Sequence, residues 1–113
     1  GLGRVEPDDV GPLDVQAPNG VVDVVVDDEA AAVRVARAAL SLLTQPLAAA
    51  GPPGAEAATL RDAVPAHRHA LYDPRRVLEA VADAGTLLQL RAAFGVGVVT
   101  ALARVGGRAV ALA

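Results

Sequence analysis

The stretch Ala93–Ala113, AFGVGVVTALARVGGRAVALA, decides the fold that we expect for this chain. Two apolar segments rich in valine and alanine, residues 96–105 and 108–113, flank the pair Gly106 and Gly107. Two consecutive glycines suit the positive φ angles of a tight hairpin turn. We therefore predict two antiparallel strands over these segments, joined by the glycine pair.

Both predicted strands are apolar on both faces, and the second is still apolar at Ala113. An isolated hairpin is not stable in water, and a strand that is apolar on both faces needs cover on both. We therefore expect more sheet beside this hairpin and further structure above it. We expect the chain to be a piece of a larger protein that supplies them.

Two elements precede the hairpin. Residues 86–90, TLLQL, predict a short strand. The sequence YDPRRVLEAVADAG predicts a helix over residues 74–84, with Asp73 as N-cap, Pro74 at the first helical position and Gly85 ending it in a left-handed turn. The apolar face expected for this helix consists of Val77, Leu78, Val81 and Ala84.

The first half of the chain holds a second strand and helix pair. Five valines follow an Asn-Gly turn signal and predict a buried strand over residues 21–27. A helix over residues 28–44 should follow, with Asp27 or Asp28 as its cap and an end before Pro46. Its expected apolar face is Val33, Ala36, Leu40 and Leu43, and its polar face Arg34, Arg37, Ser41 and Thr44.

Composition divides the chain into three parts. Residues 1–45 hold a glycine- and proline-rich loop over residues 1–20, then the first strand and helix. Residues 46–71 contain four prolines and two glycines and predict a linker. Residues 72–113 hold the second helix and the three remaining strands, so we expect two structural units of α/β class.

The 113 residues are 53% hydrophobic, but 26 are alanine and 18 valine, against one phenylalanine and one tyrosine. Each buried side chain therefore removes little apolar area from water, and we expect a marginal core. All ten basic residues are arginine, and the net charge of −3 argues against a nucleic-acid partner. The charge is uneven, because residues 61–113 are mildly basic.

The chain has no cysteine, which excludes a disulfide scaffold, a thiolate zinc site and a cysteine nucleophile. No stretch reaches the roughly 18 consecutive apolar residues of a membrane span, and no signal peptide is recognisable. We therefore expect a cytoplasmic protein without a membrane partner.

Taken in order, these segments resemble a known family. Residues 20–43, GVVDVVVDDEAAAVRVARAALSLL, and residues 63–113, which contain the YD-x-R-x-V, G-x-x-x-x-L and G-R-x-V patterns, resemble the carboxyltransferase (β) subunit of biotin-dependent acyl-CoA carboxylases of the propionyl-CoA and acetyl-CoA type. The sequence departs from the family at Pro74, where methionine is more usual, and in VVTALARV, whose side chains are smaller than usual.

The resemblance implies an α/β, crotonase-like fold with two halves, of which this chain spans the seam. Residues 1–45 would end the N-terminal half, and residues 72–113 would begin the C-terminal half. The implied reaction moves a carboxyl group from carboxybiotin, borne on a carrier protein, to the α-carbon of an acyl-CoA. The implied partners are acyl-CoA, a biotin carboxyl carrier or biotin carboxylase subunit, and further copies in a homo-oligomer.

The family is understood to stabilise both oxyanions of this reaction with backbone N–H groups, which need no reorganisation as charge develops. The glycine-rich loops that supply these groups are expected outside this sequence, so no catalytic residue is assigned here. The cofactors implied are biotin and the coenzyme A thioester, with no metal in this segment. By itself, the 113-residue segment is expected to be inactive.

Arginines provide the candidate ligand contacts. Arg68, Arg75 and Arg76 could meet the phosphates of coenzyme A, because guanidinium groups bind phosphate in a bidentate manner and the last two lie at a helix N-terminus. The alternative is that paired arginines on an exposed helix make ion pairs or subunit contacts.

Four other motifs remain, of which the first three favour structural interpretations. His67 and His69, near Asp62 and Asp73, lack a third ligand at a defined spacing, and a solvated loop is favoured over a metal site. The glycines of FGVGV, residues 94–98, favour close strand packing or a bulge over a phosphate loop. Two further motifs are the acidic run Asp27, Asp28 and Glu29, typical of a helix start, and GLG at residues 1–3, which could end a turn near a ligand pocket.

Two alternatives to the carboxyltransferase remain from the sequence. The first is a non-catalytic module that helps subunits assemble. The second is a crotonase-type acyl-CoA hydratase or isomerase, since the closing hairpin would suit that superfamily as well.

Overall fold

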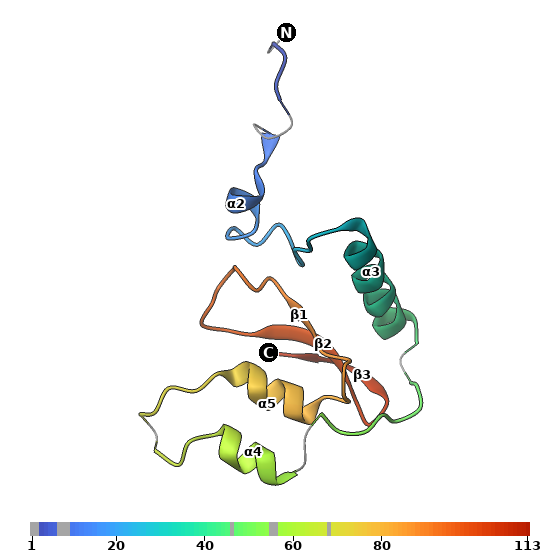
Figure 1. The fold of residues 1–113 in the computed structure, drawn as a ribbon, viewed down its shortest axis with the longest axis vertical. Coiled ribbons are helices and arrows are strands. Elements are labelled where there is room, and N and C mark those ends of the chain that lie inside the picture. Colours follow the sequence, from blue (N-terminus) through green and yellow to red (C-terminus); the bar gives the residue numbers. More distant parts are fainter. Residues whose placement is uncertain (1–2, 7–9, 46, 55–56, 68) are drawn as a thin grey trace.

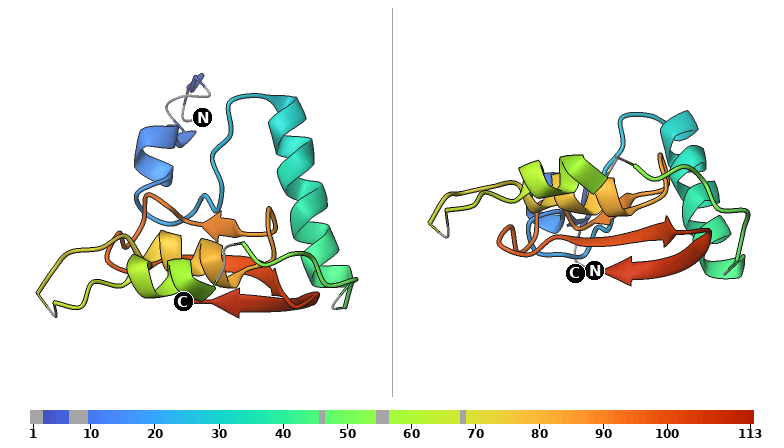
Figure 2. Two further views of the ribbon diagram at one scale, coloured as in Figure 1. Left: turned by 60° about the horizontal axis from the view of Figure 1, so that its bottom comes forward. Right: turned by 90° about the horizontal axis from the view of Figure 1, so that it is seen from below.

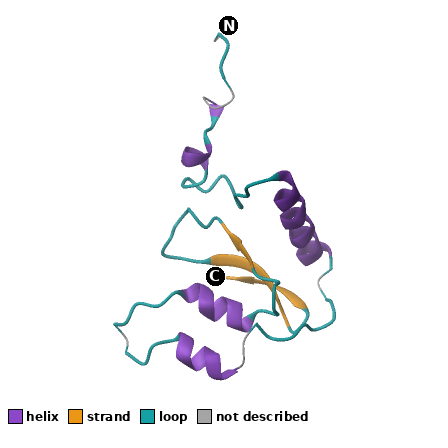
Figure 3. Ribbon diagram, in the orientation of Figure 1, coloured by secondary structure: helices purple, strands orange, loops and turns teal. Residues whose placement is uncertain are grey.

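The computed structural model describes residues 3–6, 10–45, 47–54, 57–67 and 69–113. This part of the chain forms four helices and three strands. Figure 1 shows how they are arranged, and Figure 3 shows the long loops that join them. They are α2 (Leu13–Gln16), α3 (Glu29–Thr44), α4 (Ala57–Ala63), α5 (Pro74–Val81), β1 (Leu88–Leu90), β2 (Thr100–Val105) and β3 (Arg108–Leu112). The strands form one antiparallel sheet in the order β1-β2-β3.

The predicted hairpin is confirmed. Val105 pairs with Arg108 across the turn, and Gly106 and Gly107 have φ angles of 57° and 80°. The strands are shorter than expected, because β2 begins at Thr100, not at residue 96, and β1 covers residues 88–90 within the predicted 86–90. β3 ends at Leu112.

The interpretation of FGVGV as strand or bulge is wrong. Residues 91–99 form a loop between β1 and β2, which we call the glycine loop. Gly95 has a φ of 59°, and the Val98 N–H donates to its carbonyl at 2.8 Å. A backbone that turns back on itself at Gly95 cannot continue the ladder of β2, so the strand starts only after Val99.

The buried strand predicted over residues 21–27 is also wrong. The segment forms no strand and bends at Asp23, and Val21 and Val25 are 70% and 52% exposed. In the described part of the chain, one backbone hydrogen bond joins this segment to another: the Arg91 N–H donates to the Asp23 carbonyl at 2.7 Å. Five valines favour an extended backbone, but a strand also needs a neighbouring strand along its length.

Helix α3 confirms the predicted element and its cap, because the Asp28 side chain accepts from the Ala31 N–H at 2.6 Å. The predicted apolar face is wrong. Leu40 and Leu43 are exposed, whereas Leu42 is buried. Ser41, expected on the polar face, contacts β2. Apolar residues such as Val35, Ala38 and Leu42 also lie outside the predicted apolar face, so periodicity alone could not select the side that meets the sheet.

Helix α5 begins as predicted, with the Asp73 side chain accepting from the Arg75 N–H at 3.0 Å. It ends at Val81, three residues before the predicted residue 84. Ala82 is already extended, and its carbonyl accepts from the Gly54 N–H at 2.7 Å. Gly85 does have a positive φ, 72°, but it lies in a turn beyond the helix. The hydrogen bond from the Gly54 N–H to the Ala82 carbonyl therefore accounts for the early end of this helix.

The described residues between 47 and 71 contain more regular structure than the predicted linker. They contain α4, which the sequence did not predict and which lies beside α5 on one side of the sheet (Figure 2). Isolated bridges join Leu47 to Arg108 and Pro53 to Asp83. A side chain at Gly54 would overlap the Glu79 carbonyl, so this segment passes very close to α5.

A buried carboxylate joins three of these segments. Asp83 is 5% exposed, and its side chain accepts hydrogen bonds from the Gly106 N–H at 2.8 Å, the Gly107 N–H at 2.7 Å and the Gly51 N–H at 3.4 Å. The Gly107 N–H is the main cause that lowers the pKa of Asp83, helped by Gly106, Gly51 and the charge of Arg104, against a raising effect of burial. The hairpin turn is thereby fixed to the segment after α5.

The core is small. The buried apolar side chains among the described residues are Leu42, Ala80, Ala82, Val99, Ala101 and Ala103. The radius of gyration is 17.5 Å, whereas a compact domain of this length has about 13 Å. The N-terminal residues extend away from the sheet (Figure 1). Within the described ranges, no helix combines the length and hydropathy that a membrane crossing requires.

The two turn glycines should respond differently to substitution. Gly106→Ala adds a side chain into open space and should cost only the left-handed strain, about 1 kcal/mol. Gly107→Ala also drives its Cβ into the Ala48 carbonyl, which should add roughly 1 to 3 kcal/mol. Urea unfolding of both variants measures the difference. Equal losses of stability would contradict the close approach at Gly107.

Acid should weaken the structure through Asp83. Because its pKa lies below the ordinary value of 3.8 in the folded state, its contribution is complete above that pH and is lost as the pH falls through the lowered pKa. Asp83→Asn should therefore lower the melting temperature at pH 7, and its deficit against the wild type should shrink in acid. The exposed Asp62→Asn variant is the control and should follow the wild type. A deficit that is independent of pH would refute the role of the charge.

Candidate functional site

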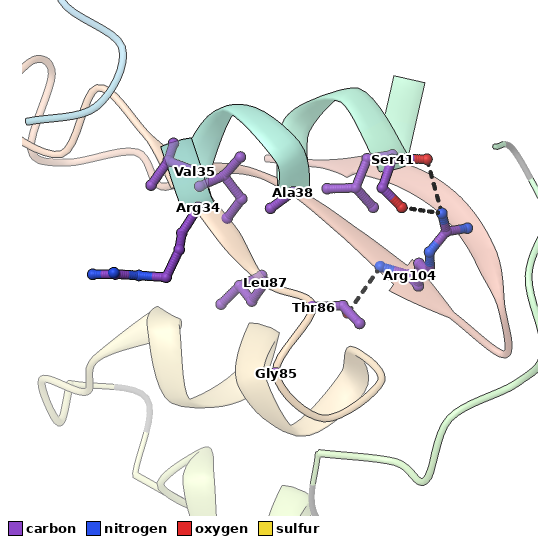
Figure 4. A pocket seen from close by; sticks show the side chains of 10 residues that line it. Arg34, Val35, Ala38, Ser41, Gly85, Thr86, Leu87 and Arg104 are labelled. Carbon is purple, nitrogen blue, oxygen red and sulfur yellow. Dashed lines mark hydrogen bonds between the residues drawn. The ribbon is translucent and has the colours of Figure 1, made fainter. Parts of the chain in front are cut away.

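A pocket of about 320 Å³ lies between α3 and the start of the sheet (Figure 4). Helix α3 supplies one wall, and the turn after α5 together with β1 and β2 supplies the other. Its lining residues are Arg34, Val35, Ala38, Ser41, Leu42, Gly85, Thr86, Leu87, Leu88 and Arg104. Most of this surface is apolar, so the polar groups at its two ends decide its chemistry.

Arg104 occupies the inner end and is only 7% exposed. Its guanidinium donates to the Gly107 carbonyl at 3.1 Å, to the Ser41 carbonyl at 2.9 Å and to the Ser41 hydroxyl at 3.2 Å. Figure 4 shows the bonds from β2 to α3. The side chain thus ties the two elements together, and its donors are directed at protein atoms.

Thr86 completes the inner polar group. Its hydroxyl donates to the Asp83 carbonyl at 2.7 Å and accepts from the Arg104 N–H at 3.1 Å. Throughout the described residues, every buried side-chain nitrogen or oxygen has a hydrogen-bond partner. Among the described residues, no hydrogen bond joins the Ser41 or Thr86 hydroxyl to a side-chain base of the kind that activates a nucleophile. Both hydroxyls instead bond to Arg104.

Arg34 is exposed, and in Figure 4 its guanidinium points away from the inner end. The pocket can therefore hold a small apolar group, with one cation near its edge. In the part of the chain that the structure describes, no three His, Asp or Glu side chains gather where they could hold a metal ion.

The structure places Arg75 and Arg76 at the start of α5, both exposed. Arg75 is engaged: its Nε donates to the Gln89 side chain at 3.0 Å, and its guanidinium lies 3.7 Å from the Asp73 carboxylate. A phosphate would have to compete with these contacts at Arg75. Binding of coenzyme A phosphates by the two arginines stays a prediction.

The remaining candidate motifs lie outside the pocket. His67 and His69 are exposed, and Arg68 lies outside the described residues. Asp28 caps α3, as expected for the acidic run. Of the GLG motif, only Gly3 is described, with a φ of 80°.

Sequence reasoning missed the polar group of Asp83, Thr86, Arg104 and Ser41. The sequence did contain a signal for Arg104. A single arginine in the apolar strand TALARV must either extend its guanidinium into solvent or have buried hydrogen-bond acceptors. Its partners could not be identified from the sequence, since Ser41 lies 63 residues away.

Comparison with known proteins agrees with this fold. Residues 8–112 match the model of the carboxyl transferase domain. The methylmalonyl-CoA carboxyltransferase 12S subunit of Propionibacterium freudenreichii subsp. shermanii is 34% identical over 105 residues, which cover 85% of this chain and 20% of that protein. The chain therefore spans about a fifth of that relative's length.

Solved structures show the same relationship. A single-chain, multi-domain long-chain acyl-CoA carboxylase aligns with a TM-score of 0.83 and 41% identity, over 97% of this chain and 11% of that one. A transcarboxylase 12S structure, a hexamer with hydrolysed methylmalonyl-coenzyme A bound, aligns with a TM-score of 0.76 and 31% identity, over 96% and 23%. These neighbours confirm the expected crotonase-like carboxyltransferase fold, and the chain belongs to the carboxyl transferase domain family.

Proposed function

We propose that the protein carrying this chain is a carboxyltransferase that moves the carboxyl group of carboxybiotin to the α-carbon of an acyl-CoA. The family match over residues 8–112 carries this proposal. The two alternatives, an assembly module and a hydratase or isomerase, are not favoured by that match. Cytoplasmic location stays a prediction.

Within that enzyme, we assign this segment a scaffolding role. Residues 1–45 would close the N-terminal half, and residues 72–113 would open the C-terminal half. The bond from Arg104 to Ser41 supports such a seam, because it joins the two parts through a buried guanidinium. Residues 46–71 would connect the halves while remaining packed against α5 and the hairpin.

The described residues do not fit carboxybiotin. The inner polar atoms of the pocket are already paired, and the clustered N–H groups of Gly51, Gly106 and Gly107 are taken by Asp83. An oxyanion hole needs donors aimed at the reacting atom. We therefore assign no step of the transfer to this chain and expect the catalytic donors elsewhere in the protein.

The partners follow from the reaction. We propose a biotin carboxyl carrier or biotin carboxylase subunit as the source of the carboxyl group, and further copies of the carboxyltransferase in a homo-oligomer. The transcarboxylase neighbour, a hexamer assembly with a multienzyme core, supports the proposed oligomer.

Carboxyl transfer can be measured directly. The protein carrying this chain, given carboxybiotin on its carrier and a panel of acyl-CoA thioesters, should form the α-carboxylated thioester. Carrier without biotin should give none, and neither should the 113-residue segment alone. Hydration or isomerisation of enoyl-CoA without any carboxylated product would favour the crotonase-type alternative.

The predicted phosphate contact at the start of α5 can be tested by charge reversal at Arg76. If Arg76 meets a phosphate of coenzyme A, Arg76→Glu should raise the KM for acyl-CoA about fivefold, the equivalent of ~1 kcal/mol. The effect should vanish with an acyl-pantetheine substrate, which lacks the nucleotide phosphates. Arg37→Glu, an exposed reversal on α3, is the matched control. An unchanged KM together with altered oligomer size would instead identify a subunit contact.

A further inference from the structure

Two residues far apart in sequence hold the glycine loop, residues 91–99, in place. The Arg91 Nε donates to the Asp23 carboxylate at 2.8 Å, and the Arg91 N–H donates to the Asp23 carbonyl at 2.7 Å. Arg91 and Asp23 thus contact each other through both their side chains and their backbones. This double contact fixes both the position and the orientation of Arg91.

Arg91 adopts an unusual backbone conformation for this contact. Its φ is 51°, and it is the one described residue other than glycine with a positive φ. Such a conformation costs a non-glycine residue about 1 to 2 kcal/mol and persists only when its surroundings hold it. Asp23 supplies two of the contacts that do so.

A second contact joins the residue three positions before Asp23 to the residue three positions after Arg91. Gly20 has a φ of 81°, and a Cβ built on it would lie 2.9 Å from the ring of Phe94. The Phe94 ring therefore packs on the bare backbone of Gly20. Together, Asp23 with Arg91 and Gly20 with Phe94 form a two-point contact that we call the clasp.

The clasp is more exposed than the Arg104–Ser41 contact, which also joins the first part of the chain to the last. The Arg91 and Asp23 side chains are 50% and 58% exposed, whereas Arg104, which binds Ser41, is buried. Exposed ion pairs are weak and are screened by salt, whereas the buried Arg104 guanidinium donates hydrogen bonds to neutral oxygen atoms of Ser41. The clasp can therefore open while α3 stays attached to β2.

Opening would reshape a second pocket. The far end of the glycine loop, residues 97–99, lines an apolar pocket of about 260 Å³ with Tyr72, Pro74, Val77, Leu78 and Ala113. The clasp holds the near end of the same loop. A change at Arg91 and Phe94 is thus transmitted to the wall of this pocket through a short, glycine-containing segment.

We propose that the clasp is a salt-sensitive strap: residues 20–23 hold the glycine loop closed, and release of the Asp23–Arg91 pair frees the loop and alters the pocket at the start of α5. The device does not depend on the chemistry of carboxyl transfer. It adds a conformational link between the two parts of the chain that meet at the proposed seam.

Hydrogen exchange in the intact protein carrying this chain tests the strap. Asp23→Asn should speed exchange of the Arg91 and Val98 amides about two- to fivefold at low salt, the range expected for an exposed pair. The Gly107 amide, bound to Asp83, should keep its wild-type rate. Raising the salt should bring the wild type toward the variant. Asp27→Asn, a neutralised exposed carboxylate in the same segment, is the matched control.

Two further variants separate the strap from general destabilisation. The charge swap Asp23→Arg with Arg91→Asp should restore slow exchange, since aspartate tolerates the left-handed conformation. Gly20→Ala should speed exchange of the same loop amides by displacing Phe94. Equal rates in Asp23→Asn and wild type, or faster exchange at Gly107 as well, would overturn the proposal, as would failure of the swap.

Discussion

The Asp83 carboxylate is the interaction on which the rest of this structure depends. It gathers the N–H groups of Gly106 and Gly107 in the hairpin turn and of Gly51 in the preceding segment. With so few large apolar side chains, burial alone gives little specificity to the packing. A buried, fully paired carboxylate fixes one arrangement of turn, helix end and connecting segment, because any other would leave the charge unpaired.

Arg104 extends this arrangement to α3. It sits close enough to Asp83 to lower its pKa, yet its guanidinium donates to the carbonyls of Gly107 and Ser41 and to the Ser41 hydroxyl. At the same turn, the Asp83 carboxylate therefore accepts from backbone N–H groups, and the Arg104 guanidinium donates to a backbone carbonyl. Gly107 serves both, since its N–H meets Asp83 and its carbonyl meets Arg104. In this structure, polar groups thus fix the relative positions of the elements, as large apolar side chains do in most protein cores.

The sequence predicted correctly those features that depend only on residues close together in the chain. The glycine pair of the hairpin and the caps Asp28 and Asp73 are short-range features, and all were confirmed. Elements that depend on distant partners were mispredicted. Valines 21–26 could not reveal that the described chain offers them no strand to pair with, and α5 ends early because Gly54 binds Ala82 from outside. The family could be identified from its series of motifs, whereas the Arg104 network could not.

The same chemistry underlies our proposal that this segment is a scaffold within the larger protein. An oxyanion hole works because its N–H groups are held in place without an internal acceptor, ready for charge that develops in the transition state. The N–H groups of Gly106 and Gly107 are equally well placed, but a permanent carboxylate occupies them. Backbone donors can either hold a fold together or await a reacting atom. In the described part of the chain, the N–H groups of Gly106 and Gly107 hold the fold together. This supports our proposal that the donors for the reacting atoms lie elsewhere in the protein.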